Sequence, residues 1–319
     1  MAKRDRTIEK LDALAALKNV SDPAVLRPAL VEALADRTYL VVAKAAALVM
    51  KHELHDLSDK MIAAFDRFME NAEKTDQGCT AKTAIVDALV KFNGEYRETY
   101  LRGLHHVQKE PVWGGSKDTA AKLRGLCALG LVALGYKDVL YEHVDLLFDA
   151  DPEARLLACR ALGGTGVDAA ALLLRSKLAA GKDTGEIYGE CFAALLSLQP
   201  NRSLDYIAKF LNNDDAQLVE AAALTIGASR HDRAFDLLRD ACAATMMTEA
   251  KTSLLLAMAM TRSPAAVDLL LEKMADHHNG GDATAALRIF RNDAATLARI
   301  EAKLTDLNSP ALQRRWRSG

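Results

Sequence analysis

The chain has 319 residues, half of them hydrophobic, and its 41 Lys and Arg residues nearly balance its 43 Asp and Glu residues. This balance disfavours a dedicated nucleic-acid-binding protein, which usually carries a strong basic excess. The N-terminal stretch is charged and lacks the apolar region of a secretory signal, and no apolar run is long enough for a membrane span.

Apolar stripes at helical spacing recur along the whole chain, and no region shows the alternation of a strand. An Ala-Leu pair or an equivalent pair marks each stripe, and successive pairs lie 29 to 41 residues apart. The marker pairs are Ala16-Leu17, Ala47-Leu48, Ala88-Leu89, Ala128-Leu129, Ala161-Leu162, Ala194-Leu195, Thr225-Ile226, Ala257-Met258 and Ala286-Leu287. Second amphipathic segments, such as residues 167–180 and 232–243, follow turn residues between the markers. The pattern predicts one all-α repeat solenoid over residues 1–319, with about eight or nine helical pairs and no β-sheet.

Two repeats are longer than the others, with the extra length at residues 71–78 and 107–117. Insertions in repeat proteins tend to lie on one face, which is often the binding face. The second insertion contains Trp113 between a proline and two glycines, so we expect this residue on a loop. Two interpretations stay open: Trp113 plugs the seam between repeats, or it anchors a partner together with Tyr96, Tyr100 and His105 on the preceding helix.

The clearest single helix is predicted between Asp151, a capping residue followed by Pro152, and the glycines at 163, 164 and 166. Its pattern Ala154-Arg155-x-x-Ala158-Cys159-x-Ala161-Leu162-Gly163 resembles the first helix of a HEAT repeat. The resemblance is closest to the short HEAT-like type of phycobilin lyases and many bacterial scaffold proteins, and it is best over residues 118–263. It implies an armadillo-like, right-handed α-α superhelix whose second helices line a concave surface.

Basic residues become more frequent at the C-terminus, where Arg314, Arg315 and Arg317 surround Trp316. Such a cluster can bind phosphates and stack bases, and a HEAT-like DNA-repair glycosylase is the family precedent. The alternative, which we favour, is a solvated helix end with a frayed tail over residues 309–319.

No set of residues assembles a recognisable catalytic or metal site. HExxH is absent, and the adjacent pairs His105-His106 and His277-His278 project in different directions from a helix. The five cysteines form no CxxC pair, so we expect five buried, free thiols in a reducing cytoplasm.

The sequence thus predicts a non-enzymatic scaffold, without cofactor or metal, that binds a protein or peptide on its concave face. The alternative is a lyase-like or DNA-repair-like HEAT enzyme that binds a bilin or nucleic acid.

Overall fold

The computed structural model describes the backbone of residues 2–318 and the side chains of residues 6–318. The chain divides into two compact units, Met1–Leu173 and Leu174–Gly319, and each is described by itself. Both units are built from α-helices that pack in neighbouring pairs, which confirms the predicted all-α solenoid.

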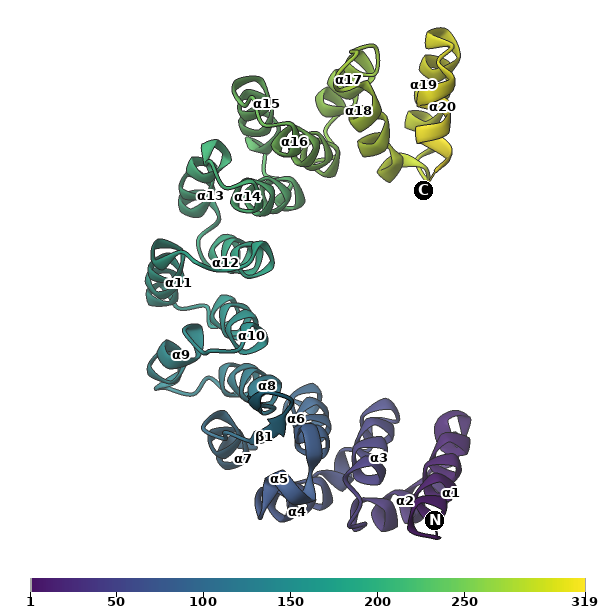
Figure 1. Ribbon diagram of the computed structural model, residues 1–319, viewed down its shortest axis with the longest axis vertical. Coiled ribbons are helices and arrows are strands. Elements are labelled where there is room, and N and C mark those ends of the chain that lie inside the picture. The colour runs from purple at the N-terminus through teal and green to yellow at the C-terminus, as the bar shows by residue number, and fades with distance from the viewer. Residues whose placement is uncertain (1, 319) are drawn as a thin grey trace. The chain divides into compact units, whose positions relative to one another are not determined.

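Over residues 2–318, nine first helices carry the marker pairs, and each is followed by a second helix. The first helices are α1 (Ala2–Ala16), α3 (Tyr39–Lys51), α6 (Thr80–Phe92), α8 (Ala121–Ala133), α10 (Pro152–Gly163), α12 (Gly185–Leu198), α14 (Ala216–Ser229), α16 (Thr248–Met260) and α18 (Gly280–Ala286). In α1 and α18 the marker alanine is the last helical residue, and the leucine begins a 3₁₀ helix. The second helices are α2 (Pro23–Leu34), α4 (Ser58–Met69), α7 (Arg97–Leu104), α9 (Val139–Leu147), α11 (Asp168–Ala180), α13 (Pro200–Ala208), α15 (Ala234–Ala244), α17 (Pro264–Lys273) and α19 (Ala294–Leu307). Within the second unit, Figure 1 shows α12, α14 and α16 in one row and α13, α15 and α17 in another.

Short elements complete the described chain. They are the helices α5 (Ala72–Thr75) and α20 (Pro310–Arg317), the strands β1 (Lys109–Val112) and β2 (Gly115–Asp118), and the 3₁₀ helices Leu17–Asn19, His55–Leu57, Gln77–Cys79, Lys209–Asn212 and Leu287–Phe290. The two insertions expected from the repeat spacing are α5 with its flanking turns and the β1–β2 hairpin.

Local signals explain where the helices begin. The Asp151 carboxylate accepts a hydrogen bond from Glu153 N at 2.9 Å, and Pro152 is the first residue of α10. Asp215 caps α14 in the same way through Gln217 N, also at 2.9 Å. These caps satisfy N–H groups that a helix leaves unpaired at its start.

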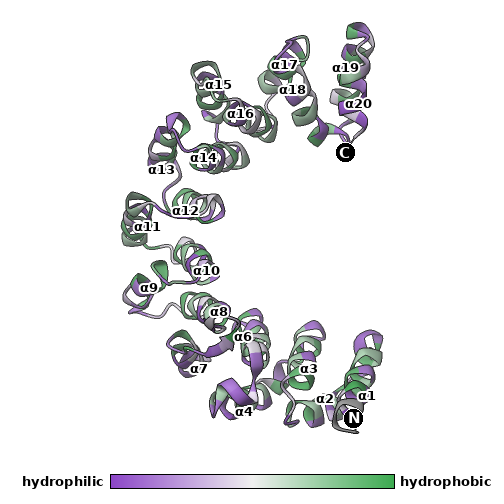
Figure 2. Cartoon of the chain, in the orientation of Figure 1, coloured by the Kyte–Doolittle hydropathy of each residue, from purple (hydrophilic) through white to green (hydrophobic). Residues whose placement is uncertain are grey.

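Within each unit the core is formed by the buried faces of both first and second helices. The helices carry hydrophobic and hydrophilic residues side by side (Figure 2). Marker alanines such as Ala88, Ala128 and Ala161 are completely buried. Small residues are needed at these contacts: a Cβ added at Gly125 of α8 would lie 2.4 Å from the Leu157 side chain of α10. All five cysteines are buried thiols outside any disulfide, as predicted.

The hairpin corrects the expectation of a chain without strands. Lys109 pairs with Asp118 and Val112 pairs with Gly115 in an antiparallel register, with Trp113 and Gly114 at the turn. Gly114 adopts φ 87°, which glycine tolerates at a tight turn. The proline and glycines around Trp113 predicted a loop, and Trp113 lies at the turn, but the strands on either side were not expected. Proline is compatible with an edge strand, and both strands of an isolated hairpin are edges.

Candidate functional site

The first insertion is organised by a buried ion pair. The Asp76 carboxylate accepts hydrogen bonds from Ala81 N at 2.7 Å and from Lys82 N at 3.0 Å, at the start of α6. It also accepts one from Lys82 Nζ at 2.9 Å, and both side chains are completely buried. Lys82 Nζ donates a further bond to Phe68 O. Both charges are therefore paired and hydrogen-bonded, which is the condition for burying them without a prohibitive cost.

The hairpin is tied to this first insertion by Gln108 and Glu110. The buried amide of Gln108 donates from Nε2 to Asp76 O at 2.7 Å and to Glu110 Oε1 at 2.6 Å. The same Glu110 oxygen accepts from Gly78 N at 2.7 Å and from Thr119 Oγ1 at 3.1 Å. Two insertions that are far apart in the sequence therefore form one hydrogen-bonded structure.

Arg124 of α8 fixes the second strand at the base of the hairpin. Its guanidinium lies 2.6 Å from an Asp118 carboxylate oxygen and 2.7 Å from one of Asp149, and it donates to His106 O at 3.0 Å. Burial acts to raise the pKa of Asp118, but hydrogen bonds from Ala120 N, Gln108 N and Arg124 outweigh it, so that the pKa is lowered overall. Asp118 therefore remains ionised and holds the base of the hairpin in place.

The tip of this anchored hairpin is apolar and exposed. Trp113 is fully exposed, at 103% of its reference area, and the exposed fraction of Val112 is 49%. Lys109 and Lys117 are exposed along the two strands, and neither forms an ion pair with a described residue. The interpretation of Trp113 as a plug between repeats is wrong, because no described part of the chain covers its side chain.

The three residues predicted to accompany Trp113 lie in different surroundings. Tyr100 is only 1% exposed, and its ring lies where a Cβ at Gly130 of α8 would otherwise be, so it belongs to the core and is not a surface contact. Tyr96 is half-buried and donates from its hydroxyl to Ser58 Oγ at 2.8 Å. His105 is exposed, with Nε2 3.1 Å from Glu142 Oε2 of α9. The helical periodicity of the sequence could not separate these roles, because the Tyr100 ring packs beside a glycine on another helix.

The C-terminal basic residues form helix α20 in place of a frayed tail. Arg315 lies 3.3 Å from Asp282 of α18, and the Arg291 guanidinium stacks 5.1 Å from the centre of the Trp316 ring. Trp316 is half-buried, while Arg314 and Arg317 remain exposed. Two members of the predicted phosphate-binding cluster thus contact the chain itself.

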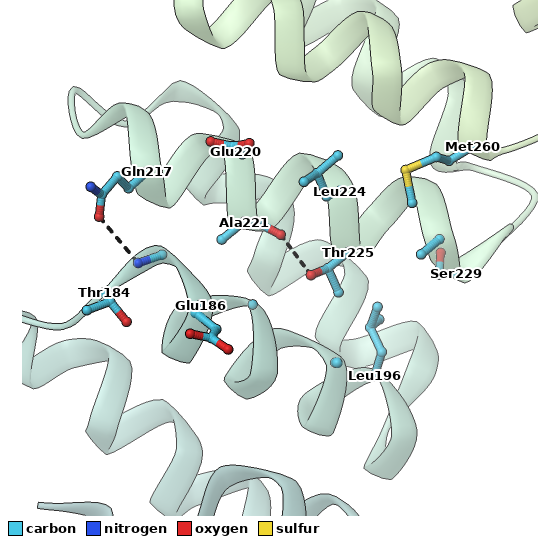
Figure 3. Close-up of a pocket in the computed structure, with 14 residues that line it drawn as sticks. Thr184, Glu186, Leu196, Gln217, Glu220, Ala221, Leu224, Thr225, Ser229 and Met260 are labelled. Carbon is cyan, nitrogen blue, oxygen red and sulfur yellow. Dashed lines mark hydrogen bonds between the residues drawn. The ribbon is translucent and has the colours of Figure 1, made fainter. Parts of the chain in front are cut away.

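A groove of about 920 Å³ lies in the second unit, between α12 and α14 and beside the end of α16 (Figure 3). It was not predicted from the sequence. Its lining residues are mostly small or apolar and include no Lys, Arg or His; they are Thr184, Gly185, Glu186, Gly189, Ala193, Leu196, Gln217, Glu220, Ala221, Leu224, Thr225, Ala228, Ser229 and Met260. The groove lies on the first helices, whereas the resemblance implied a binding surface on the second helices. Small residues four apart, at 185, 189 and 193, are the sequence signal that could have indicated it.

Neither metal clusters nor membrane spans are found where the structure is described. No group of three or more His, Cys, Asp or Glu side chains over residues 6–318 is arranged to hold an ion. None of the helices in the same part of the chain has both the length and the apolar character needed to cross a bilayer.

Comparison with known proteins assigns no family. No protein-family model matches the chain, and no curated protein matches it in sequence. Among solved structures, the chain is similar to one in the complex of CpcE and CpcF of phycocyanin lyase from Nostoc sp. PCC7120, with 16% identity and a TM-score of 0.39. The alignment covers 88% of this chain and 94% of the other.

Proposed function

We propose that this protein is a non-enzymatic scaffold that binds a protein partner through Trp113 at the tip of the β1–β2 hairpin. The observation that carries the proposal is the contrast between the fully exposed Trp113 and the buried hydrogen bonds of Gln108 at the hairpin base. A tryptophan that packs against nothing adds no stability to the fold, and burying such a ring against a partner removes about 150–250 Å² from water.

The anchored base supports this role energetically. Binding costs free energy when a flexible segment must become ordered, and a pre-organised hairpin avoids much of that cost. Tryptophan is enriched at interface hot spots, where its truncation costs about 2 kcal/mol or more.

The hairpin also suggests what the partner offers. Both carboxylates of the hairpin are engaged at its base: Asp118 pairs with the Arg124 guanidinium, and Glu110 accepts hydrogen bonds from Gly78 N and Gln108 Nε2. Lys109 and Lys117 have no such partner among the described side chains. The complementary surface is therefore an apolar pocket, large enough for an indole ring and bordered by acidic residues.

Three of the five thiols disfavour catalysis by a cysteine nucleophile. Burial raises the pKa of Cys79 to about 12 and raises the pKa values of Cys127 and Cys242. A thiol in this state is protonated and shielded, whereas a nucleophilic cysteine needs a thiolate that is accessible.

The test is affinity capture from an extract of the source cells, with the wild-type chain, Trp113→Ala and Trp316→Phe immobilised in parallel. We expect a protein that is recovered with wild type and with Trp316→Phe but is lost with Trp113→Ala, while the melting temperature of Trp113→Ala stays unchanged. Equal recovery on Trp113→Ala, or recovery of nucleic acid instead of protein, would contradict the proposal. So would an absorbance change on adding a bilin that all three chains share.

A further inference from the structure

The groove between α12 and α14 has a floor that the chain itself leaves open. Gly189 lies inside α12, where glycine costs about 0.5–1 kcal/mol relative to alanine. A Cβ added at Gly189 would meet no atom within 4 Å. Its φ is not positive, so no backbone conformation requires glycine there.

Three other glycines inside helices are explained by packing. A Cβ at Gly103 would lie 2.4 Å from Cys127 Sγ, one at Gly130 would lie 2.6 Å from the Tyr100 ring, and one at Gly227 would lie 2.3 Å from Ala257 O. Each of these glycines lets two elements of the chain approach closely. Gly189 allows the same close approach, but on a side where the chain supplies no neighbour.

The two ends of the groove differ in chemistry, as Figure 3 shows. Glu186 and Glu220 lie toward one end, and both are exposed and have no ion-pair partner among the described residues. Leu196 and Met260 lie toward the other end. Between them the Thr225 hydroxyl donates to Ala221 O at 2.7 Å, so the middle of the groove offers little unsatisfied polarity.

The acidic end keeps a negative charge when the helix dipoles are included. The N-termini of α12 and α14 lie at this end, marked by the bond from Gly185 N to Gln217 Oε1 at 3.3 Å. Each N-terminus contributes about half a positive elementary charge. The two carboxylates carry two negative charges and the two helix ends about one positive charge, so about one negative charge remains. No cationic side chain lines the groove to offset it.

We infer that this groove binds an amphipathic helix of a partner protein, with basic residues over Glu186 and Glu220 and a large apolar residue between Leu196 and Met260. Helices seat their apolar face in such grooves through residues at i, i+3, i+4 and i+7. The small side chains of Gly189, Ala193 and Ala221 allow the backbone of a third helix to approach α12 and α14. This inference concerns the second unit and is independent of the Trp113 proposal, so either can fail alone.

The probe is a synthetic fluorescent helical peptide with leucines at i, i+3, i+4 and i+7 and lysines elsewhere; a second peptide has glutamate in place of lysine. Binding to the full chain is measured by fluorescence anisotropy at low and high salt. We expect the lysine peptide to bind, and we expect Gly189→Leu and Ala193→Leu, both at open positions, to weaken it about tenfold. The double variant Glu186→Lys/Glu220→Lys should weaken it about threefold, and only at low salt.

Matched controls lie on second helices of the same unit. Ala243→Leu adds the same side chain at an exposed position of α15, and Glu272→Lys reverses an exposed charge on α17. Neither should change the affinity, and circular dichroism should show the same helix content in every variant. The inference is overturned if wild type does not bind the lysine peptide, if it prefers the glutamate peptide, or if the groove variants bind as wild type does.

Discussion

The hairpin region of the first unit and the groove of the second unit depart from the regular helical pair in opposite ways. The hairpin is an added element, held by buried polar groups that include the completely buried Asp76, Lys82 and Gln108. The groove involves no added element; it lies where α12 carries the small residues Gly189 and Ala193. One region thus projects an apolar side chain, and the other leaves space for one. A repeat fold can thus depart from its regular pair either by inserting an element or by shortening side chains.

The largest effect is expected where the hairpin region depends on a buried charge. Lys82→Met should destabilise the first unit by about 3–5 kcal/mol, because it leaves the Asp76 carboxylate buried without its counter-charge. Urea unfolding followed by circular dichroism measures this loss. The control is Lys10→Met, which breaks the ion pair with Asp36, where the exposed fraction of the lysine side chain is 54%; it should cost less than about 1 kcal/mol. Equal stability of the two variants would mean that the buried pair does not organise the insertion.

Two glycines of the second unit test whether the groove floor is open, because one is packed against a neighbour and the other is not. Gly227→Ala should cost about 1–3 kcal/mol, since its Cβ would lie 2.3 Å from Ala257 O. Gly189→Ala should instead stabilise the chain by about 0.5–1 kcal/mol, because alanine favours the helix and meets nothing. Thermal unfolding of both variants tests this difference in sign. Destabilisation by both would show that the groove floor is packed in solution.

A smaller effect of pH is expected from His143 in the first unit. Its ring is completely buried, Nδ1–H donates to Val139 O at 2.6 Å, and burial lowers the pKa below the usual 6.5. The folded state therefore resists protonation more than the unfolded state, and stability should fall as the pH drops below 6.5. In His143→Asn this pH dependence should become shallower. Some dependence should remain, since burial also lowers the pKa of His106. An identical slope in wild type and His143→Asn would contradict this assignment.

The repeat fold could be predicted because its signals are local. Capping residues such as Asp151 and Asp215 directly precede the helices that they cap, and marker alanines such as Ala161 lie within their helices. The two insertions were also predictable, because they lengthen the interval between markers. These features require only neighbouring residues and a count along the chain.

The structure of the insertions could not be predicted, because it depends on contacts between distant residues. Gln108 reaches Asp76 across 32 positions, and no sequence pattern connects them. The burial of Tyr100 depends on Gly130 of another helix. The groove was missed because it consists of absent side chains, and Gly189 in a sequence resembles any glycine that weakens a helix. Exposure of Trp113 was one of two open interpretations, and only the structure distinguishes them.

The state of Trp113 in solution tests the central proposal most directly. Trp316→Phe leaves Trp113 as the single tryptophan of the chain. Without a partner, its fluorescence should show the red-shifted emission of indole in water and nearly the full iodide quenching of free tryptophan amide. Adding the captured partner should shift the emission to the blue and protect the indole from iodide. Blue-shifted emission that iodide does not quench, in the chain without a partner, would contradict the account, because Trp113 would then already be buried.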